Sequence, residues 1–236
     1  MEEINPLTIL EYEKEIAAYR VNNFNKKQNR QVKKEEKNEE LDNAVLYIES
    51  RARVYGNIIT SDLLGLQEGN ISYFVELEHR FKTRERIKEK ILQKMIVDNS
   101  SMREAINGIY DALRYTIVIT DELYIEKVLE YLNKIEQLGY QIIRFRNSWG
   151  NEYYQGINVS FVDPDGFKFE VQFHTPNSYS IKEGKLRDVY NIIRDPNSKD
   201  EIVKKANAIR KYYQSLVKIP DGALDYQYVS SAKKRG

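Results

Sequence analysis

The chain has 236 residues with 37 Lys and Arg against 36 Asp and Glu, so its net charge of +1 implies no general attraction to nucleic acid. It has no cysteine and two histidines, which excludes disulfides, thiolate chemistry and a histidine-rich metal centre but leaves a hard cation with oxygen ligands open. No stretch is apolar enough for a membrane span, and residues 1–6 lack a secretory signal. We therefore expect a protein that acts in the cytoplasm, with export by a route that reads no such signal left open.

Residues 1–70 predict a helical and charged N-terminal extension, and residues 71–236 predict one further domain. Within the extension, residues 23–43 form a polar, charge-dense run that is typical of a solvated helix or a mobile arm. From residue 44 to residue 97 apolar side chains recur at mainly helical intervals, with Gly56 and Gly65 as expected breaks between short helices.

The middle of the chain alternates between helical and strand patterns. Ser101 and Glu104 fit a capping box, which predicts a short helix running toward Tyr110. The β-branched run 114–120 predicts a strand, and residues 123–138 return to helical spacing that Gly139 closes.

The second half begins with a strand over residues 141–145 and continues with two strands over residues 157–162 and 167–174. Residues 163–166 have the Asp-Pro-Asp-Gly composition of a tight turn, so these two strands predict a hairpin. Ser198 and Glu201 suggest a second capping box, opening a helix that ends near Val217. The order of elements indicates an α+β fold with a mixed or antiparallel sheet flanked by helices.

Polar side chains alternate with apolar ones along the predicted hairpin. A period of two places Glu170, Gln172 and His174 on one face together with Asn158 and Ser160, and the aromatic side chains between them on the other. One face of an antiparallel sheet is commonly just solvated, so this polar face by itself does not indicate a site.

Two charged features favour a functional interpretation. Asp111 and Arg114 lie where the short helix runs into the first predicted strand, and a second carboxylate facing Asp111 would complete an oxygen site for Mg²⁺. Arg80, Lys82 and Lys90 belong to a basic helical cluster of the kind that binds phosphates, although an isolated basic helix face is usually only solvated.

A mixture of cations and aromatic rings precedes the hairpin. Arg144, Arg146, Trp149 and Tyr154 could stack a base and bind its phosphates, while aromatic rings beside arginine are equally common in ordinary packing.

Taken in order over residues 73–190, these blocks resemble the synthetase domain of the RelA/SpoT family and its small stand-alone relatives. The resemblance implies a fold of the RelA/SpoT nucleotidyltransferase type for residues 71–236 and an ATP-dependent pyrophosphokinase activity. It implies that Asp111 and Glu170 hold Mg²⁺ and that Glu170 is the base. It further implies nucleotide contacts, with Arg80, Lys82, Lys90 and Arg114 on the ATP donor, Tyr154 stacked on the acceptor base, Arg146 on its phosphates, and Gln172, Asn158 and His174 beside them.

Three positions depart from the family pattern, with Gly156, Asn158 and His174 where guanosine-using relatives have Ser, His and Arg. These forms look more like the toxin-type small alarmone synthetases. The resemblance therefore implies transfer of pyrophosphate from ATP to the ribose 3′-hydroxyl of a purine nucleotide. It also implies an adenosine preference, a (p)ppApp-like product, growth inhibition, and an antitoxin or immunity protein as partner.

Two alternatives stay open at this point. One is a toxin that pyrophosphorylates the 3′ end of tRNA, with the basic N-terminal region as a docking arm. The other is a degenerate member, part of a phage or mobile element, that binds a nucleotide or a partner without catalysis; the retained Asp111 and Glu170 argue against it. The sequence leaves the oligomeric state open.

Overall fold

The computed structural model describes residues 5–31, 39–151, 154–195 and 197–227, with the backbone alone described for 21–31. Contacts divide the chain into two compact units. The sheet unit comprises Asn38–Gly150, Gly156–Pro176 and Ile219–Gly236, and the helical unit comprises Met1–Lys37, Asn151–Gln155 and Asn177–Lys218. The predicted domain boundary at residue 70 stays a prediction. Residues 32–38, part of the expected polar arm, lie outside the described residues.

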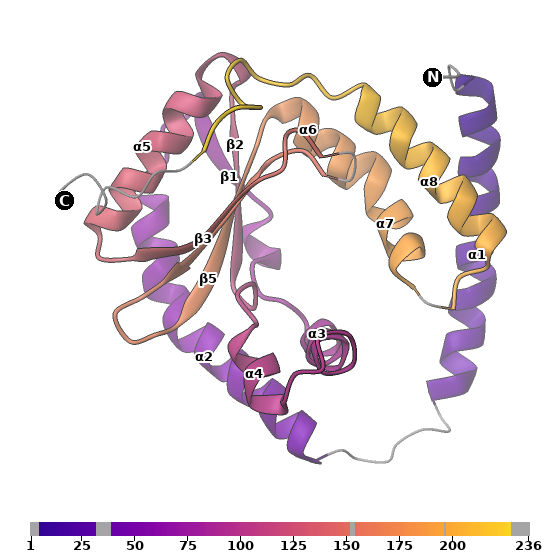
Figure 1. The fold of residues 1–236 in the computed structure, drawn as a ribbon, viewed down its shortest axis with the longest axis horizontal. Coiled ribbons are helices and arrows are strands. Elements are labelled where there is room, and N and C mark those ends of the chain that lie inside the picture. Colours follow the sequence, from indigo (N-terminus) through magenta and orange to yellow (C-terminus); the bar gives the residue numbers. More distant parts are fainter. Residues whose placement is uncertain (1–4, 32–38, 152–153, 196, 228–236) are drawn as a thin grey trace. The chain divides into compact units, whose positions relative to one another are not determined.

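The sheet unit is built on five strands in the order β1-β2-β5-β4-β3 (Figure 1). Among the described strands β2 and β5 pair in parallel and the other three pairs are antiparallel, which confirms the predicted α+β fold with a mixed sheet. The strands are β1 Ser72–Val75, β2 Arg114–Ile119, β3 Gln141–Asn147, β4 Ile157–Val162 and β5 Lys168–His174.

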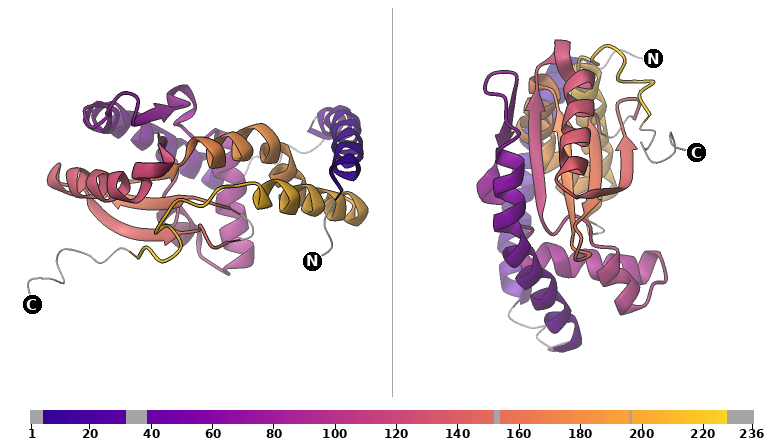
Figure 2. Two further views of the ribbon diagram at one scale, coloured as in Figure 1. Left: turned by 90° about the horizontal axis from the view of Figure 1, so that it is seen from above. Right: turned by 90° about the vertical axis from the view of Figure 1, so that its left-hand side faces the viewer.

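One face of this sheet forms the core of the unit. Tyr115 of β2 and Phe173 of β5 are buried on it, and two helices cover them. The ring of Tyr131 on α5 lies 5.9 Å from that of Phe173, and Thr60 Oγ1 on α2 lies 2.8 Å from Tyr115 Oη. Figure 2 shows these two helices beside the strands in two further views. The helices of the sheet unit are α2 Glu39–Leu64, α3 Arg84–Val97, α4 Met102–Asn107 and α5 Tyr124–Gln137, with short turns η1 Leu77–His79 and η2 Asp121–Leu123.

The helical unit is described separately. Its α1 packs along α8, where Tyr213 Oη donates to Glu13 Oε1 at 2.9 Å. A π-helical turn interrupts the helix that follows β5. The elements after β5 are α6 Pro176–Ser180, the π turn η3 Ile181–Leu186, α7 Arg187–Arg194 and α8 Asp200–Ser215, and α1 is Pro6–Gln31. None of the described helices is long and apolar enough to cross a membrane.

Most of the predicted elements from residue 101 onward are confirmed. Ser101 caps α4 with both bonds of the capping box, although α4 ends at Asn107 rather than near Tyr110. The strand over residues 114–120, the helix over 123–138 and the hairpin are present with small changes of boundary.

Three expectations were wrong. Helix α2 runs through Gly56 without a break. The ring of Phe81 packs against this glycine, since a Cβ on residue 56 would lie only 2.8 Å from Phe81 Cε1. Strand β1 was missed, since four residues are too short to show a period of two. Helix α8 begins after Lys199, which provides no side-chain cap, so Ser198 does not form the expected capping box.

Candidate active site

The parallel pairing of β2 and β5 brings a guanidinium and a carboxylate side by side. Arg114 is in register with Glu170, and Glu170 N donates to Leu113 O at 3.0 Å. On the other side Ser160 pairs with Glu170, and Arg144 pairs with Ser160. Register partners point to the same face, so these four side chains form a polar row across the sheet, opposite the core.

A second polar row lies two residues further along. Gln172 pairs with Thr116 on β2 and with Asn158 on β4, and Asn158 pairs with Arg146 on β3. Gln172 Nε2 donates to Glu170 Oε1 at 2.8 Å, which connects the two rows and orients the carboxylate. The sequence did not predict this hydrogen bond, nor that Thr116 lies on the polar face. The alternation of side chains along β2 could have predicted the position of Thr116.

The segment before α3 places Lys82 beside Asp111. Phe81 bridges Leu113, Lys82 N donates to Ala112 O at 2.9 Å, and Arg114 N donates to Arg80 O at 2.8 Å. Residues 80–82 therefore run antiparallel to residues 112–114, at the start of β2. As a result Lys82 Nζ lies 2.9 Å from Asp111 Oδ2.

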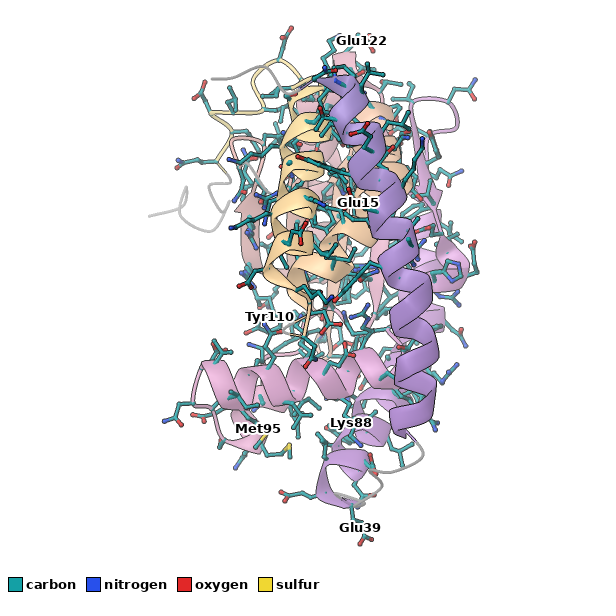
Figure 3. The ribbon with its side chains drawn as sticks, turned by 90° about the vertical axis from the view of Figure 1, so that its right-hand side faces the viewer. Glu15, Glu39, Lys88, Met95, Tyr110 and Glu122 are labelled. Atoms are coloured by element: carbon teal, nitrogen blue, oxygen red, sulfur yellow. The ribbon has the colours of Figure 1, made fainter. Side chains whose placement is uncertain are left out.

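Helix α3 supplies the second lysine. Thr83 caps the helix by accepting from Arg86 N, and Lys90, in the second turn, lies with its Nζ 2.7 Å from Asp111 Oδ1. Figure 3 shows the side chains of α3, on which Lys88 and Met95 are labelled. Both oxygens of Asp111 are thus bound by lysines from the cluster that the sequence assigned to phosphate.

The electrostatics of these groups depend on burial. Burial acts to raise the pKa of Asp111, but the charges and hydrogen bonds of Lys82 and Lys90 outweigh it and lower that pKa to about 2. For Lys82 burial prevails, and its pKa is lowered despite Asp111. Burial also raises the pKa of Glu170, and the negative charge of Asp111 raises it further, against the opposing charge of Arg114. Asp111 and Glu170 are therefore close enough to repel each other.

Two of the departures from the family pattern pack against each other. His174 is fully buried, and a Cβ on Gly156 would lie 2.9 Å from His174 Cε1 and 2.9 Å from Phe173 O. That spacing is too short for any side chain at 156, so glycine there makes room for histidine at 174. A direct contact of His174 with the acceptor stays a prediction.

The remaining candidates lie as follows. Trp149 is buried, with its ring 5.2 Å from that of Tyr124 in an edge-to-face contact. This residue therefore packs in the core rather than in a site for stacking a base. Arg80 donates to Leu77 O at 2.7 Å, with its guanidinium 4.5 Å from the centre of the Phe81 ring. Tyr154 belongs to the helical unit, whereas the other candidates belong to the sheet unit.

No family model matches the sequence, and no curated protein matches it. Solved structures similar to this chain include the small alarmone synthetase 2 from Bacillus subtilis, at 15% identity over 72% of this chain and 92% of that one, with a TM-score of 0.47. They also include a GTP pyrophosphokinase family protein from Streptococcus pneumoniae, at 16% identity over 78% of this chain and 90% of that one, with a TM-score of 0.43. A third is the Type VI effector Tas1 in complex with its immunity protein, at 14% identity over 75% of this chain and 96% of that one, with a TM-score of 0.38. These proteins are of the kind that the sequence motifs resemble, and at identities of 14–16% and TM-scores below 0.5 the likeness says nothing about the activity of this chain.

Proposed function

We propose that the protein is a Mg²⁺-dependent pyrophosphokinase that transfers the β,γ-pyrophosphate of ATP to the ribose 3′-hydroxyl of a purine nucleotide, with adenosine nucleotides favoured. The observation that supports this most strongly is the part-buried Asp111 between Lys82 and Lys90, with Glu170 and Arg114 in register beside it. Carboxylates paired with several cations on one sheet face suit a polyphosphate and a hard ion together.

The residues present fit a magnesium ion. Two carboxylates are enough, because Mg²⁺ in nucleotide sites commonly takes one or two from the protein and the rest of its ligands from phosphates and water. When bound, the ion would offset the negative charge of the phosphates. Burial and, after it, the negative charge of Asp111 raise the pKa of Glu170, and a cation beside both carboxylates would relieve their repulsion.

The lysines have a second partner in this proposal. Lys82 and Lys90 contact both oxygens of Asp111 in the structure, and in this proposal they would contact phosphates instead when Asp111 holds the ion. The triphosphate offers the lysines new oxygens at the same moment, and Arg114 and Arg80 add further donors. Holding the phosphates in line then supplies most of the acceleration, since phosphoryl transfer depends on positioning and charge stabilisation.

The transfer step balances as follows. The 3′-oxygen forms a bond to the β-phosphorus, the bond from that phosphorus to the α,β-bridging oxygen breaks, and AMP leaves with the electron pair. The hydroxyl proton goes to Glu170, whose raised pKa makes it a better base than an ordinary carboxylate. Gln172 keeps that carboxylate oriented through its 2.8 Å bond. Tyr154 would stack the acceptor base. Arg146 would contact phosphates of the acceptor, as would Asn158 and His174 from the neighbouring strands of the sheet unit.

The experiment is incubation of purified protein with ATP labelled at the γ-phosphate, Mg²⁺, and ADP, AMP, GDP or tRNA in separate reactions. The proposal predicts labelled 3′-pyrophosphorylated nucleotides, with ADP or AMP used at least as well as GDP. Label appearing only on tRNA would favour an RNA-directed enzyme, and no transfer to any acceptor would leave a nucleotide-binding protein without this activity.

The proposal extends to the cell. It includes action in the cytoplasm, growth inhibition by depletion of adenosine nucleotides, and an antitoxin or immunity protein as partner. Induced expression of the wild type should arrest growth, and expression of Glu170→Gln should not. Arrest by both would separate toxicity from catalysis.

A further inference from the structure

A buried glutamine in the helical unit has an unused acceptor. Gln214 lies in the last turn of α8 and its side chain is 6% exposed. Its Nε2 donates to Tyr190 Oη at 3.1 Å, while its Oε1 has no hydrogen-bond partner among the described residues. A buried acceptor without a donor costs free energy, so such a group calls for a specific explanation.

The same residue contacts the segment that carries Tyr154. Gln155 Nε2 donates to the backbone oxygen of Gln214 at 3.2 Å, and Val217 N donates to that oxygen at 3.2 Å. The last carbonyls of a helix lack donors within it, which leaves this oxygen available to both. Gln214 is therefore where the Tyr154–Gln155 stretch meets α8, and the unpartnered Oε1 lies on this residue.

We propose that Gln214 is a specificity-determining residue, whose Oε1 accepts a hydrogen bond from the exocyclic amino group of a purine stacked on Tyr154. This rests on the proposed function, because it assigns a contact to the acceptor nucleotide. Adenine carries an amino donor at C6, where guanine carries an acceptor oxygen. A glutamine oxygen held in place by the bond from its Nε2 to Tyr190 therefore matches adenine and repels guanine at that position.

The test compares two acceptors that differ only in this amino group, ADP and the 5′-diphosphate of purine riboside, with ATP and Mg²⁺ and the full chain. The wild type should show a KM for ADP that is about 3- to 10-fold lower, the worth of one hydrogen bond between neutral groups. Gln214→Met keeps the length and helix preference of the side chain and removes the acceptor, so the ratio should fall to about 1. Gln137→Met, on an exposed glutamine at the end of α5, is the matched control and should leave the ratio unchanged.

The outcomes separate this inference from the proposed function. Equal KM values for both acceptors in the wild type, or an unchanged ratio in folded Gln214→Met, would overturn the role of Gln214 while pyrophosphate transfer stands. If neither acceptor is turned over, the proposed function fails; calorimetric binding of the two nucleotides then still shows whether Gln214 distinguishes them. Should Gln214→Met not fold, the wild-type comparison alone decides.

Discussion

Two clusters of lysines and carboxylates in the sheet unit have the same chemistry and differ in burial. The first, the Asp111 cluster, consists of Lys82, Lys90 and Asp111. The second, the α5 cluster, consists of Glu68, Lys127, Glu130 and Lys134. In the sequence both are charged residues near helices, and neither pattern alone indicates function.

The pKa values show what burial changes. Asp111 and Glu130 both have a pKa lowered to about 2, but the Asp111 side chain is 13% exposed and that of Glu130 is 34% exposed. Hydrogen bonds raise the pKa of Lys127, whereas burial lowers that of Lys82 although it touches a carboxylate. The α5 cluster has two lysines and two glutamates and is balanced in charge. The Asp111 cluster has two cations on one carboxylate, so it has positive charge available for a ligand.

The largest expected effect follows from removing a carboxylate from each cluster. Asp111→Asn or Glu170→Gln should lower kcat about 10²-fold or more, because each removes a metal-site charge that acts in the transition state. Glu130→Gln is the control and should leave kcat unchanged. Near-normal turnover of a folded Asp111→Asn or Glu170→Gln variant, measured with labelled ATP, would remove these residues from the mechanism.

Removing a lysine should separate donor from acceptor. Lys82→Ala should raise the KM for ATP about 10-fold or more, the worth of a charge-assisted hydrogen bond, and leave the KM for the acceptor unchanged. Tyr154→Ala should do the reverse. Lys127→Ala should change neither constant. If Lys82→Ala and Tyr154→Ala both altered only the ATP dependence, the assignment of two pockets would be wrong.

The carboxyls of Asp111 and Glu170 should affect stability in opposite directions as pH changes. The pKa of Glu170 is raised above its usual 4.5, so from about 4.5 upward the folded state holds more protons than the unfolded one and stability falls as pH rises to the folded pKa. The pKa of Asp111 is about 2 instead of 3.8, so its contribution is present above 3.8 and is lost as pH falls toward 2. Urea titrations of the wild type and Glu170→Gln between pH 4 and pH 8 measure the first effect. A wild-type decline identical to that of the variant would contradict it.

The smallest effect is expected in the α5 cluster. Lys134→Ala should leave activity unchanged and move the urea midpoint very little, and 1 M NaCl should remove that small difference, because exposed ion pairs are weak and screened. A large loss of activity in this variant would mean that burial does not distinguish the two clusters.

The sequence predicted those parts of the fold whose signals are local. The alternation along β4 and β5, the turn at residues 163–166 and the Ser101 capping box are each contained within a few residues, and all are present. One of the three failures depended on a distant contact. Gly56 was taken for a helix break because the packing of Phe81 against it, set by the bridge to Leu113, cannot be seen in the local sequence.

The candidate site divides in the same way. The common face of Glu170 and Gln172 follows from the period of a strand, and it could be predicted. The bond from Lys90 to Asp111 spans 21 residues and depends on how the segment before α3 pairs with the start of β2. Sequence therefore supplied both groups but not their contact, nor the burial that lowers the pKa of Lys82.

The most direct measurement is a crystal structure with Mg²⁺ and α,β-methylene-ATP, an analogue whose reacting bond cannot break. We predict one ion ligated by Asp111 and Glu170, with Lys82 and Lys90 moved from the aspartate onto phosphate oxygens. A structure in which nucleotide and ion bind elsewhere while both lysines stay on Asp111 would contradict it.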